Sequence, residues 1–473
     1  MKLWATGVGC LLVAACAGAA DQPFMSLQWG AVSNSPAEAG QLLDALGRYP
    51  SCFDAVRFYG AKPSADVEAA LKKLGVAAAT GERAPALTYA CGRSEPRAMI
   101  GSAFLFAGSA DLSVARVGTG RQCASGKSAQ ALCVESMLYL AFGASGLEYG
   151  LMGYAHEPSA WYANTYLSEL TVWHPYYQSY TRYNAETKPG GFLPFCGKNG
   201  KPDLAGTLRA AEALATTGLP LCPGSPWSVG YILTAESVDS MTEVDIQRVL
   251  SGGSLLDGGA VAKLQARGYG AAMKMTAQPR DPEIREAFTD DELNRDHVNY
   301  VWQPEAAKSE TFALFPSNEA ARVIGRYQRA DGTAAEAASV LTETASGGRI
   351  AAFGFAGFGA EVSAARRRQL LLAADWVAMG RLPVFVETVS QLVAVPRVAL
   401  AGDLKSVTLL NAAIDRQPPV TLRLRGCKAG LETVEWLVPK EKPVALAVRW
   451  ENKDALVVLP EMAPWQIGWL RLD

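Results

Sequence analysis

The stretch KSAQALCVESMLYLAFGASGLEYGLMGY, from Lys127 to Tyr154, contains the two kinds of segment that decide the fold. Its first part, SAQALCVESMLYLAFGA, is long and apolar enough for a buried helix, and GLEYGLMGY is typical of a short strand. A helix that leads directly into a strand is the repeating unit of parallel α/β sheets. We therefore expect an α/β fold, and the flanking sequence extends the pattern.

Around this stretch, from Phe24 to Tyr183, short apolar runs alternate with amphipathic segments. FMSLQWGAV and FDAVRFYG predict strands, and SPAEAGQLLDALGRY, with Ser35 and Pro36 at its start, predicts a helix. SADVEAALKKLG predicts a second helix that ends at Gly75. APALTYA, MIGSAFLFAG and LSVARVG predict further strands. The alternation indicates parallel βα units, as in a barrel or a doubly wound sheet.

Downstream, KPGG at residues 188–191 marks a domain boundary by its turn-forming residues. A second βα region follows with GGFLPF, DLAGTLRAAEALATTG and SVGYILTA, and a charged, irregular segment near 271–318 predicts an insertion. From about Pro383, short β-rich segments separated by turns predict a β-sandwich. The predicted organisation is an export signal at 1–20, a (β/α) barrel-like domain at 22–188, an α/β domain at 189–382 and a β-sandwich at 383–473.

The first twenty residues, MKLWATGVGCLLVAACAGAA, are typical of an export signal. Lys2 supplies a positive charge, Val8–Ala15 an apolar run too short to span a bilayer, and small residues permit cleavage before Asp21. VAAC, ending at Cys16, resembles a bacterial lipobox, so lipidation of Cys16 and membrane attachment are an equal alternative. The expected location is therefore the periplasm, the outer membrane as a lipoprotein, or the medium.

The composition excludes several classes of function. A formal net charge of −2 over 473 residues leaves no basic footprint for nucleic acid. With three histidines and no CxxC spacing, neither a metal nor an organic cofactor is expected. Of nine cysteines, seven follow the signal, and an oxidising compartment would allow disulfides. Cys123 with Cys133 and Cys196 with Cys222 are candidate pairs, which leaves an odd thiol.

Four segments resemble bacterial β-galactosidase-like glycoside hydrolases. They are SGGSLLDGGAVAKLQARGYG (Ser251–Gly270), GRLPVFVET (Gly380–Thr388), LLNAAIDRQPP (Leu409–Pro419) and LPEMAPWQIGWLRL (Leu459–Leu472). The opening helix–strand stretch is similar to the last such unit of the family's barrel, so the resemblance covers most of Ser113–Asp473. It implies a (β/α)8 barrel, a flavodoxin-like or glutamine-amidotransferase-like α/β domain and a C-terminal β domain. It also implies a glycan partner and a homo-oligomer, a trimer or a dimer, because the family's amidotransferase-like domain often mediates trimerisation.

The chain departs from the family's pattern in two respects. Family barrels place a glutamate acid/base after the fourth strand and a glutamate nucleophile after the seventh, but LSVARVGTG has Arg116 and Val117 where the nucleophile is expected. Roughly 160 residues follow the signal before Tyr183, against about 250 in a complete barrel. The barrel-like domain is therefore expected to be truncated, or to be completed by a partner chain or by other residues.

Candidate catalytic residues lie in and after the strand GLEYGLMGY. Glycoside hydrolysis uses two carboxyl groups, and Glu148 and Glu157 are the predicted pair. If Glu148 faces the barrel interior, Tyr149 faces the helices, and Glu157 lies in the loop where barrel active sites form. In the alternative interpretation, Glu148 pairs with Arg57 or Arg116, and Glu157 is solvated or caps a helix.

The residues predicted to bind substrate are Trp29, Arg57, Tyr154, His156 and Trp161. The planar fork of Arg57 suits a sugar hydroxyl or a substrate carboxylate, with a structural ion pair involving Asp54 as the alternative. Trp29 is a candidate stacking platform, or a core residue. His156 binds a hydroxyl or packs within its loop, and Tyr154 and Trp161 add aromatic rings beside the glutamates.

An aromatic segment and a glycine-rich motif allow two further predictions. In WYANTYLSELTVWHPYYQSYTRY, a stripe of large side chains at three- and four-residue steps begins at Tyr162 and Tyr166 and continues from Leu170 to Tyr180. Pro175 predicts that the stripe is broken into two pieces. The stripe is expected to close the barrel and meet the next domain, with carbohydrate stacking as the alternative. GGSLLDGG lacks the glycine spacing of a nucleophile elbow and the cysteine of amidotransferases, so its domain is expected to be non-catalytic. The sequence as a whole predicts an exported protein that acts on a glycan by paired carboxylates. A non-catalytic carbohydrate-binding or scaffold protein derived from a glycoside hydrolase is the alternative.

Overall fold

The computed structural model describes residues 24–28, 36–59, 62–81, 96–108, 114–118, 127–150, 163–195, 205–224, 226–280, 285–302, 310–359, 363–388 and 390–472. The chain divides into two compact units. The first unit comprises Met1–Gly92, Leu112–Ser136 and Ala144–Arg182, and the second comprises Arg93–Asp111, Met137–Gly143 and Tyr183–Asp473. The predicted domain limits remain predictions, because these units interleave along the sequence.

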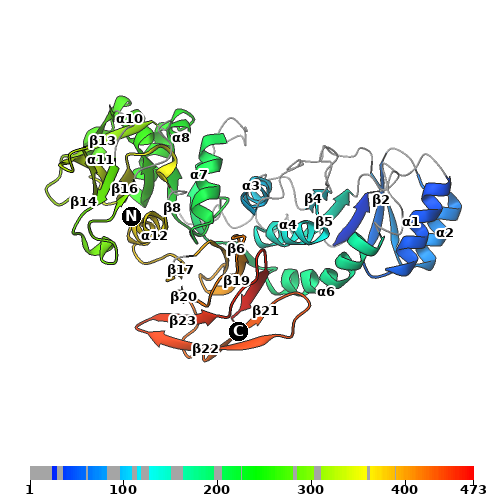
Figure 1. Cartoon of the computed structure of the whole chain (residues 1–473). Coiled ribbons are helices and arrows are strands. Elements are labelled where there is room, and N and C mark those ends of the chain that lie inside the picture. Colours follow the sequence, from blue (N-terminus) through cyan, green and yellow to red (C-terminus); the bar gives the residue numbers. More distant parts are fainter. Residues whose placement is uncertain are drawn as a thin grey trace, which may run out of the picture. The chain divides into compact units, whose positions relative to one another are not determined.

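The first unit is built on a five-stranded parallel sheet in the order β3-β2-β1-β5-β4 (Figure 1). Its strands are β1 (Met25–Gln28), β2 (Ala55–Tyr59), β3 (Ala77–Gly81), β4 (Val114–Gly118) and β5 (Gly146–Gly150). The helices that follow these strands are α1 (Pro36–Arg48), α2 (Ala65–Lys73) and α4 (Ala129–Ala141), and after β5 come the π-helical turn η1 (Ala163–Leu167) and α6 (Ser168–Tyr183).

The strand order places the connecting helices on one face of this sheet. The steps from β1 to β2 to β3, and from β4 to β5, run in the same direction across the sheet. Because strand–helix–strand crossovers are right-handed, α1, α2 and α4 lie on the same face, as in a (β/α) barrel. In a doubly wound sheet the direction reverses and helices cover both faces. Among the described residues β3 and β4 do not pair, so the described sheet is open.

The two faces of the sheet differ in polarity. One face is buried and almost entirely apolar, with Met25, Leu27, Val56, Phe58, Ala115, Val117, Leu147 and Tyr149. The hydroxyl of Tyr149 donates a hydrogen bond of 2.9 Å to Ser136 of α4, so this is the face that the helices cover, as predicted for Tyr149. The opposite face carries Ser26, Arg57, Tyr59, Arg116 and Glu148, because strand side chains alternate.

Helix α6 confirms the predicted stripe and corrects its predicted break. Leu170, Trp173, Tyr177 and Tyr180 are all buried along one side of the helix. Pro175 lies inside α6, which runs uninterrupted from Ser168 to Tyr183, so the prediction of two pieces is wrong. A proline in a helix interior costs about 3 kcal/mol. Burial of large apolar side chains, about 1.5–3 kcal/mol each, on both sides of Pro175 outweighs that cost.

The predicted strand MIGSAFLFAG is also wrong, because it forms α3 (Pro96–Ala107) in the second unit. Met99, Ile100, Ala103 and Phe104 are buried at the spacing of one helix face. A continuous apolar run of this length fits a strand or a buried helix equally well, so its periodicity could not distinguish the two structures. The predicted strand APALTYA lies outside the described residues.

The second unit contains a ten-stranded mixed sheet. Neighbouring strands β7, β8, β9 and β16 run parallel, and antiparallel strands extend the sheet beyond β16. Its strands are β7 (Gly191–Pro194), β8 (Ser228–Leu233), β9 (Ser254–Asp257), β10 (Met275–Arg280), β11 (Arg285–Phe288), β12 (Val301–Trp302), β13 (Thr311–Pro316), β14 (Arg322–Gln328), β15 (Ala334–Glu343) and β16 (Arg349–Phe353). The segment near 271–318, predicted to be irregular, therefore supplies β10 to β13.

Helices accompany this sheet along the chain. They are α7 (Ala205–Ala215), α8 (Ala235–Asp239), α9 (Glu243–Gly252), α10 (Gly258–Ala266), α11 (Gly270–Met273) and α12 (Ala364–Val377), with short 3-10 turns η2 (Glu292–Asn294) and η3 (Ala356–Gly359). Apolar residues of α9 and α10, among them Ile246, Val249, Val261 and Leu264, join the buried core with Leu256 of β9. This burial fixes the helices against the sheet.

A nine-stranded antiparallel sheet ends the second unit, in the order β17-β20-β23-β22-β21-β24-β19-β18-β6. Its strands are β6 (Thr187–Pro189), β17 (Val384–Val386), β18 (Leu392–Ala399), β19 (Leu404–Asn411), β20 (Val420–Leu424), β21 (Thr433–Leu437), β22 (Val444–Glu451), β23 (Asp454–Leu459) and β24 (Ile467–Arg471). The first half of β22 pairs with β21 and its second half with β23. A strand that divides its pairing in this way forms a corner between two sheet halves.

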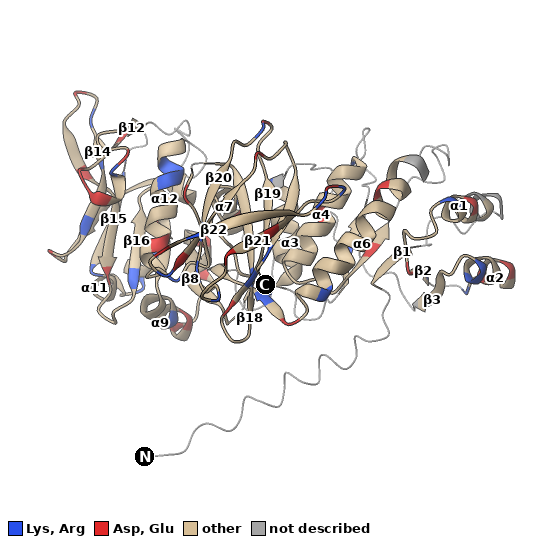
Figure 2. Cartoon of the chain, turned by 90° about the horizontal axis from the view of Figure 1, so that it is seen from below, with Lys and Arg blue, Asp and Glu red and all other residues tan. Residues whose placement is uncertain are grey.

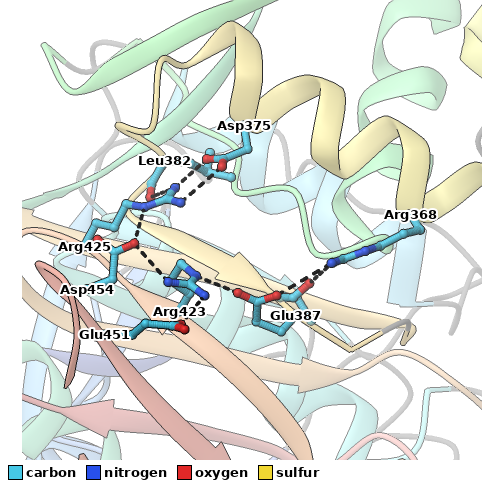
Figure 3. Close-up of polar contacts among 9 residues, drawn as sticks. Arg368, Asp375, Leu382, Glu387, Arg423, Arg425, Glu451 and Asp454 are labelled. Carbon is cyan, nitrogen blue, oxygen red and sulfur yellow. Dashed lines mark hydrogen bonds and ion pairs between the residues drawn. The ribbon is translucent and has the colours of Figure 1, made fainter. Parts of the chain in front are cut away.

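An ionic network joins α12 to this antiparallel sheet (Figure 3). This α12 network consists of Arg368, Arg423 and Arg425 with Asp375, Glu387, Glu451 and Asp454. Arg423 of β20 donates to Glu387 at 2.6 Å and to Glu451 at 2.7 Å. Arg425 binds both carboxylate oxygens of Asp375, which lies on α12. The guanidinium groups are thus bonded on several sides, and the network acts as a fixed structural link.

Charged residues of both signs are interspersed over the helices and strands (Figure 2). On α2, Asp66 and Glu68 lie in the first turn and Lys72 and Lys73 in the last, which suits the helix dipole. In the part of the chain that the structure describes, no helix is both long and apolar enough to cross a membrane. Each candidate disulfide has one member, Cys123 or Cys196, outside the described residues, so the pairings stay predictions.

Candidate functional site

The candidate site lies on the polar face of the five-stranded sheet. Four side chains form the Glu148 cluster: Arg57, Tyr59, Arg116 and Glu148. The side chain of Glu148 is 1% exposed, whereas those of Arg57 and Arg116 are 20% and 17% exposed. The carboxylate is therefore buried, whereas the two arginine side chains are partly exposed.

The strand register explains why these side chains meet. Arg116 of β4 lies directly beside Glu148 of β5, and Ser26 of β1 lies beside Glu148 on the other side. Arg57 and Tyr59 lie beyond β1, on β2, and share the same face. Adjacent strands are about 4.8 Å apart, so the long side chain of Arg57 spans β1 to reach Glu148. The small side chain of Ser26 leaves room for it.

Both carboxylate oxygens of Glu148 are engaged. Tyr59 donates its hydroxyl to Oε2 at 2.6 Å, and Nε of Arg116 donates to Oε1 at 3.1 Å. Nε of Arg57 lies 3.4 Å from Oε2 and completes an ion pair. Two guanidinium groups and a hydroxyl donor thus surround the carboxylate.

Tyr59 stays protonated in this setting. Burial of its hydroxyl, and then its hydrogen bond to Glu148, raise the pKa of Tyr59 to about 12. At neutral pH it is therefore a hydrogen-bond donor and carries no charge. The cluster then has two positive charges against one negative, which leaves one positive charge.

The structure brings together two of the predicted site residues, Glu148 and Arg57. The pairing of Glu148 with both Arg57 and Arg116, given above as an alternative, is present. The other predicted site residues, Glu157, Trp29, Tyr154, His156 and Trp161, lie outside the described residues. Their predicted roles, and the catalytic role of Glu148, stay predictions.

Sequence reasoning missed Tyr59 as a member of the site and considered Arg116 only as a partner of Glu148. The signal for Tyr59 is its spacing. In FDAVRFYG, Arg57 and Tyr59 are two residues apart, so a strand directs both to the same face. The signal for Arg116 is the two-residue alternation in LSVARVG, which leaves this arginine among apolar residues.

Asp54 has a structural role at the other end of β2. Its carboxylate accepts a hydrogen bond of 2.8 Å from the backbone N–H of Met25 and lies 3.4 Å from Nε2 of His174 on α6. Nδ1 of His174 donates to the carbonyl of Ser51 at 2.8 Å. Despite the opposing effect of burial, these contacts lower the pKa of Asp54 and raise that of His174.

The motif GGSLLDGG forms the junction of β9 and α10. Asp257 caps α10 by accepting from the N–H of Ala260 at 2.8 Å, and burial raises its pKa to about 6. A Cβ on Gly258 would lie 2.8 Å from the carbonyl oxygen of Gly354, so only glycine fits. The helix cap and the close packing at Gly258 explain why this motif has an aspartate followed by glycine. Among the described residues, no group of three or more histidine, cysteine or acidic side chains is arranged to hold a metal ion.

No protein-family model matches this chain, and no curated protein matches it in sequence. Its fold is similar to that of α-L-fucosidase isoenzyme 2 from Paenibacillus thiaminolyticus, with a TM-score of 0.55 and 12% identity over 93% of this chain and 81% of that chain.

Two β-galactosidases match more weakly. A catalytic mutant of Gan42B, a GH42 β-galactosidase from G. stearothermophilus, matches with a TM-score of 0.47 and 9% identity, over 88% of this chain and 63% of that chain. The β-galactosidase from the Antarctic haloarchaeon Halorubrum lacusprofundi matches with a TM-score of 0.43 and 10% identity, over 92% and 67%. The similarity to the fucosidase shows that the chain has a glycoside hydrolase-like fold.

Proposed function

We propose that this protein acts on a glycan, as a member of the β-galactosidase-like glycoside hydrolases, and binds the saccharide at the Glu148 cluster. The observation that carries the proposal is the buried carboxylate on the polar face of a parallel sheet whose helices cover the other face. In (β/α) enzymes the polar interior and the carboxyl ends of the strands hold the active site. The fold similarity to the α-L-fucosidase supports the same class.

The proposed chemistry is hydrolysis by two carboxyl groups, Glu148 and Glu157. Such pairs lie about 5 Å apart in retaining enzymes and about 6.5–9.5 Å apart in inverting ones, and one member must be ionised while the other donates a proton. Glu148 lies between two guanidinium groups and accepts a hydrogen bond from Tyr59, and we assign it the role of nucleophile or general base. Glu157 is then the general acid.

A non-catalytic carbohydrate-binding protein is the second candidate, and one observation favours it. Both oxygens of Glu148 already accept hydrogen bonds, and the side chain is 1% exposed. A nucleophile has to reach the anomeric carbon, so these donors would have to yield when substrate binds. In a binding protein they would remain in place.

The test is a panel of aryl glycosides and natural oligosaccharides, assayed for hydrolysis and for binding. We expect Glu157→Gln to lower kcat by about 10²–10⁴-fold, with the larger loss on natural substrates, whose leaving groups need a proton. Glu148→Gln should lower kcat on all substrates alike. Glu68→Gln, an exposed change on α2, is the control. Binding without turnover would support the second candidate, and neither binding nor turnover would contradict both.

Export and assembly are further parts of the proposal. The N-terminal segment supports transport out of the cytoplasm, followed by cleavage before Asp21 or lipidation of Cys16. The family resemblance supports a trimer or a dimer. Mass spectrometry of the mature N-terminus distinguishes the two maturation routes, and light scattering gives the oligomeric state.

A further inference from the structure

The charge balance of the Glu148 cluster suggests which saccharides it binds. This step rests on the proposed function, since it takes the cluster as the saccharide site. Arg57 and Arg116 supply two positive charges and Glu148 one negative, and Tyr59 is neutral because its pKa is about 12. A neutral sugar has no need of the remaining positive charge.

The arginine donors make few hydrogen bonds to described residues. Among the residues that the structure describes, the only hydrogen bond from either guanidinium group is the one from Nε of Arg116 to Glu148. Nε of Arg57 is buried without a hydrogen bond, held 3.4 Å from the same carboxylate. The terminal Nη groups, four N–H donors on each arginine, make no bond to a described residue.

Both Nε atoms face the buried carboxylate, and both side chains keep about a fifth of their surface exposed, with values of 20% and 17%. The end edge of a planar guanidinium is formed by its two Nη groups, so an arginine that holds Glu148 through Nε keeps the N–H donors of that edge for a second acceptor. The contacts with Glu148 thereby also hold the two arginine side chains in place.

We infer that the Glu148 cluster binds acidic saccharides, through an oxyanion on the sugar that accepts hydrogen bonds from the Nη groups of Arg57 and Arg116. Carboxylate and sulfate oxygens match the spacing of a guanidinium fork, and charge-assisted bonds of this kind are about twice as strong as neutral ones. The substrate class is therefore a uronic-acid glycan or a sulfated glycan, which present the same chemistry.

The experiment is titration calorimetry of the full chain with three trisaccharides. They are an oligogalacturonate, its methyl ester, which masks the carboxylates on the same sugar, and a sulfated galactan. We expect the charged ligands to bind about tenfold more tightly than the ester, and the preference to weaken in high salt. Whichever charged ligand binds more tightly identifies the oxyanion.

Variants assign the preference to the arginines. Arg57→Gln keeps a hydrogen-bonding side chain, leaves Arg116 to neutralise Glu148, and should abolish the preference. Arg116→Gln is the second variant and should act in the same direction. Arg48→Gln, an exposed change on α1 of the same unit, is the matched control and should retain the preference. Circular dichroism confirms that each variant is folded.

Two results would overturn the inference. If the methyl ester binds as tightly as the free acid, the oxyanion is not recognised, while the proposed glycan site stands. If neither charged trisaccharide binds, the inference fails, and the glycoside panel described above then decides whether the proposed function fails with it.

Discussion

The Glu148 cluster of the first unit and the α12 network of the second use the same residue types with opposite proportions. The α12 network has three arginines and four carboxylates, whereas the Glu148 cluster has two arginines and one carboxylate. Arg423 donates to three carboxylates (Figure 3). Arg57 donates a hydrogen bond to no described residue.

This difference separates a structural ion-pair network from the binding site that we propose. In the α12 network, Arg423 and Arg425 each donate to carboxylates from Nε and from both Nη groups, and this fixes α12 to the antiparallel sheet. When guanidinium groups outnumber acceptors, positive charge and N–H donors remain for a ligand. Removing one member of each set tests this difference.

The largest effect is expected from Glu148→Gln. This change leaves two guanidinium groups without their buried counter-charge, and breaking a buried pair typically costs about 3–5 kcal/mol. Because both arginines keep some exposure, we expect a loss of about 3 kcal/mol in the free energy of unfolding of the first unit. Denaturant titration followed by circular dichroism measures it. A variant as stable as the wild type would show that the arginines do not depend on Glu148.

A smaller effect is expected from Arg425→Gln in the α12 network. Arg425 binds both oxygens of Asp375, and Nε donates to Asp454 at 3.1 Å, but these carboxylates are 23% and 22% exposed and can recover water. We expect a loss of about 1–2 kcal/mol, confined to the transition of the second unit. A loss equal to that of Glu148→Gln would contradict the distinction between the two sets.

The pair of Asp54 and His174 should make stability depend on pH where the arginine clusters do not. The raised pKa of His174 gives stability that is complete below the ordinary value of 6.5 and is lost as pH rises through the folded pKa. The lowered pKa of Asp54 gives stability that is complete above 3.8 and is lost as pH falls through its folded pKa. The pair therefore stabilises most between these values. In the wild type the melting temperature should fall as the pH rises above 6.5, and in His174→Gln this fall should be absent. If the variant shows the same fall, the pair is not the cause of the pH dependence.

The smallest effect is expected from Arg48→Gln. Arg48 and Asp44 form an i,i+4 pair on α1 with side chains 51% and 64% exposed. Such surface pairs contribute about 0.3–0.5 kcal/mol, and salt screens them. The change should be nearly silent in both unfolding and ligand binding. A loss above about 1 kcal/mol would mean that exposed pairs in this unit are stronger than usual.

Much of the architecture follows from local sequence rules. Pro36 begins α1 and Gly75, with φ of 74°, follows α2, as the cap signals predict. The polarity pattern of GLEYG correctly directs Tyr149 toward α4 and Glu148 away from it. The strands of the first unit could be predicted because short apolar segments alternate with amphipathic ones along the sequence.

Other features depend on tertiary structure and could not be predicted. The run that forms α3 is apolar throughout, so its period carries no information, and β3, with the sequence AAATG, has too little apolar character to stand out. Pro175 is tolerated because the buried side chains around it compensate for the lost bond. The Glu148 cluster joins β2, β4 and β5, and its membership depends on a strand order that no local pattern encodes.

The most direct test of the account is a crystal structure of the chain with the acidic trisaccharide that binds most tightly. We predict that an oxyanion of the sugar lies about 2.7–3.2 Å from the Nη groups of both Arg57 and Arg116, while their Nε atoms still face Glu148. A saccharide bound elsewhere, with these Nη groups bonded to the protein itself, would contradict it and make the cluster a structural ion pair.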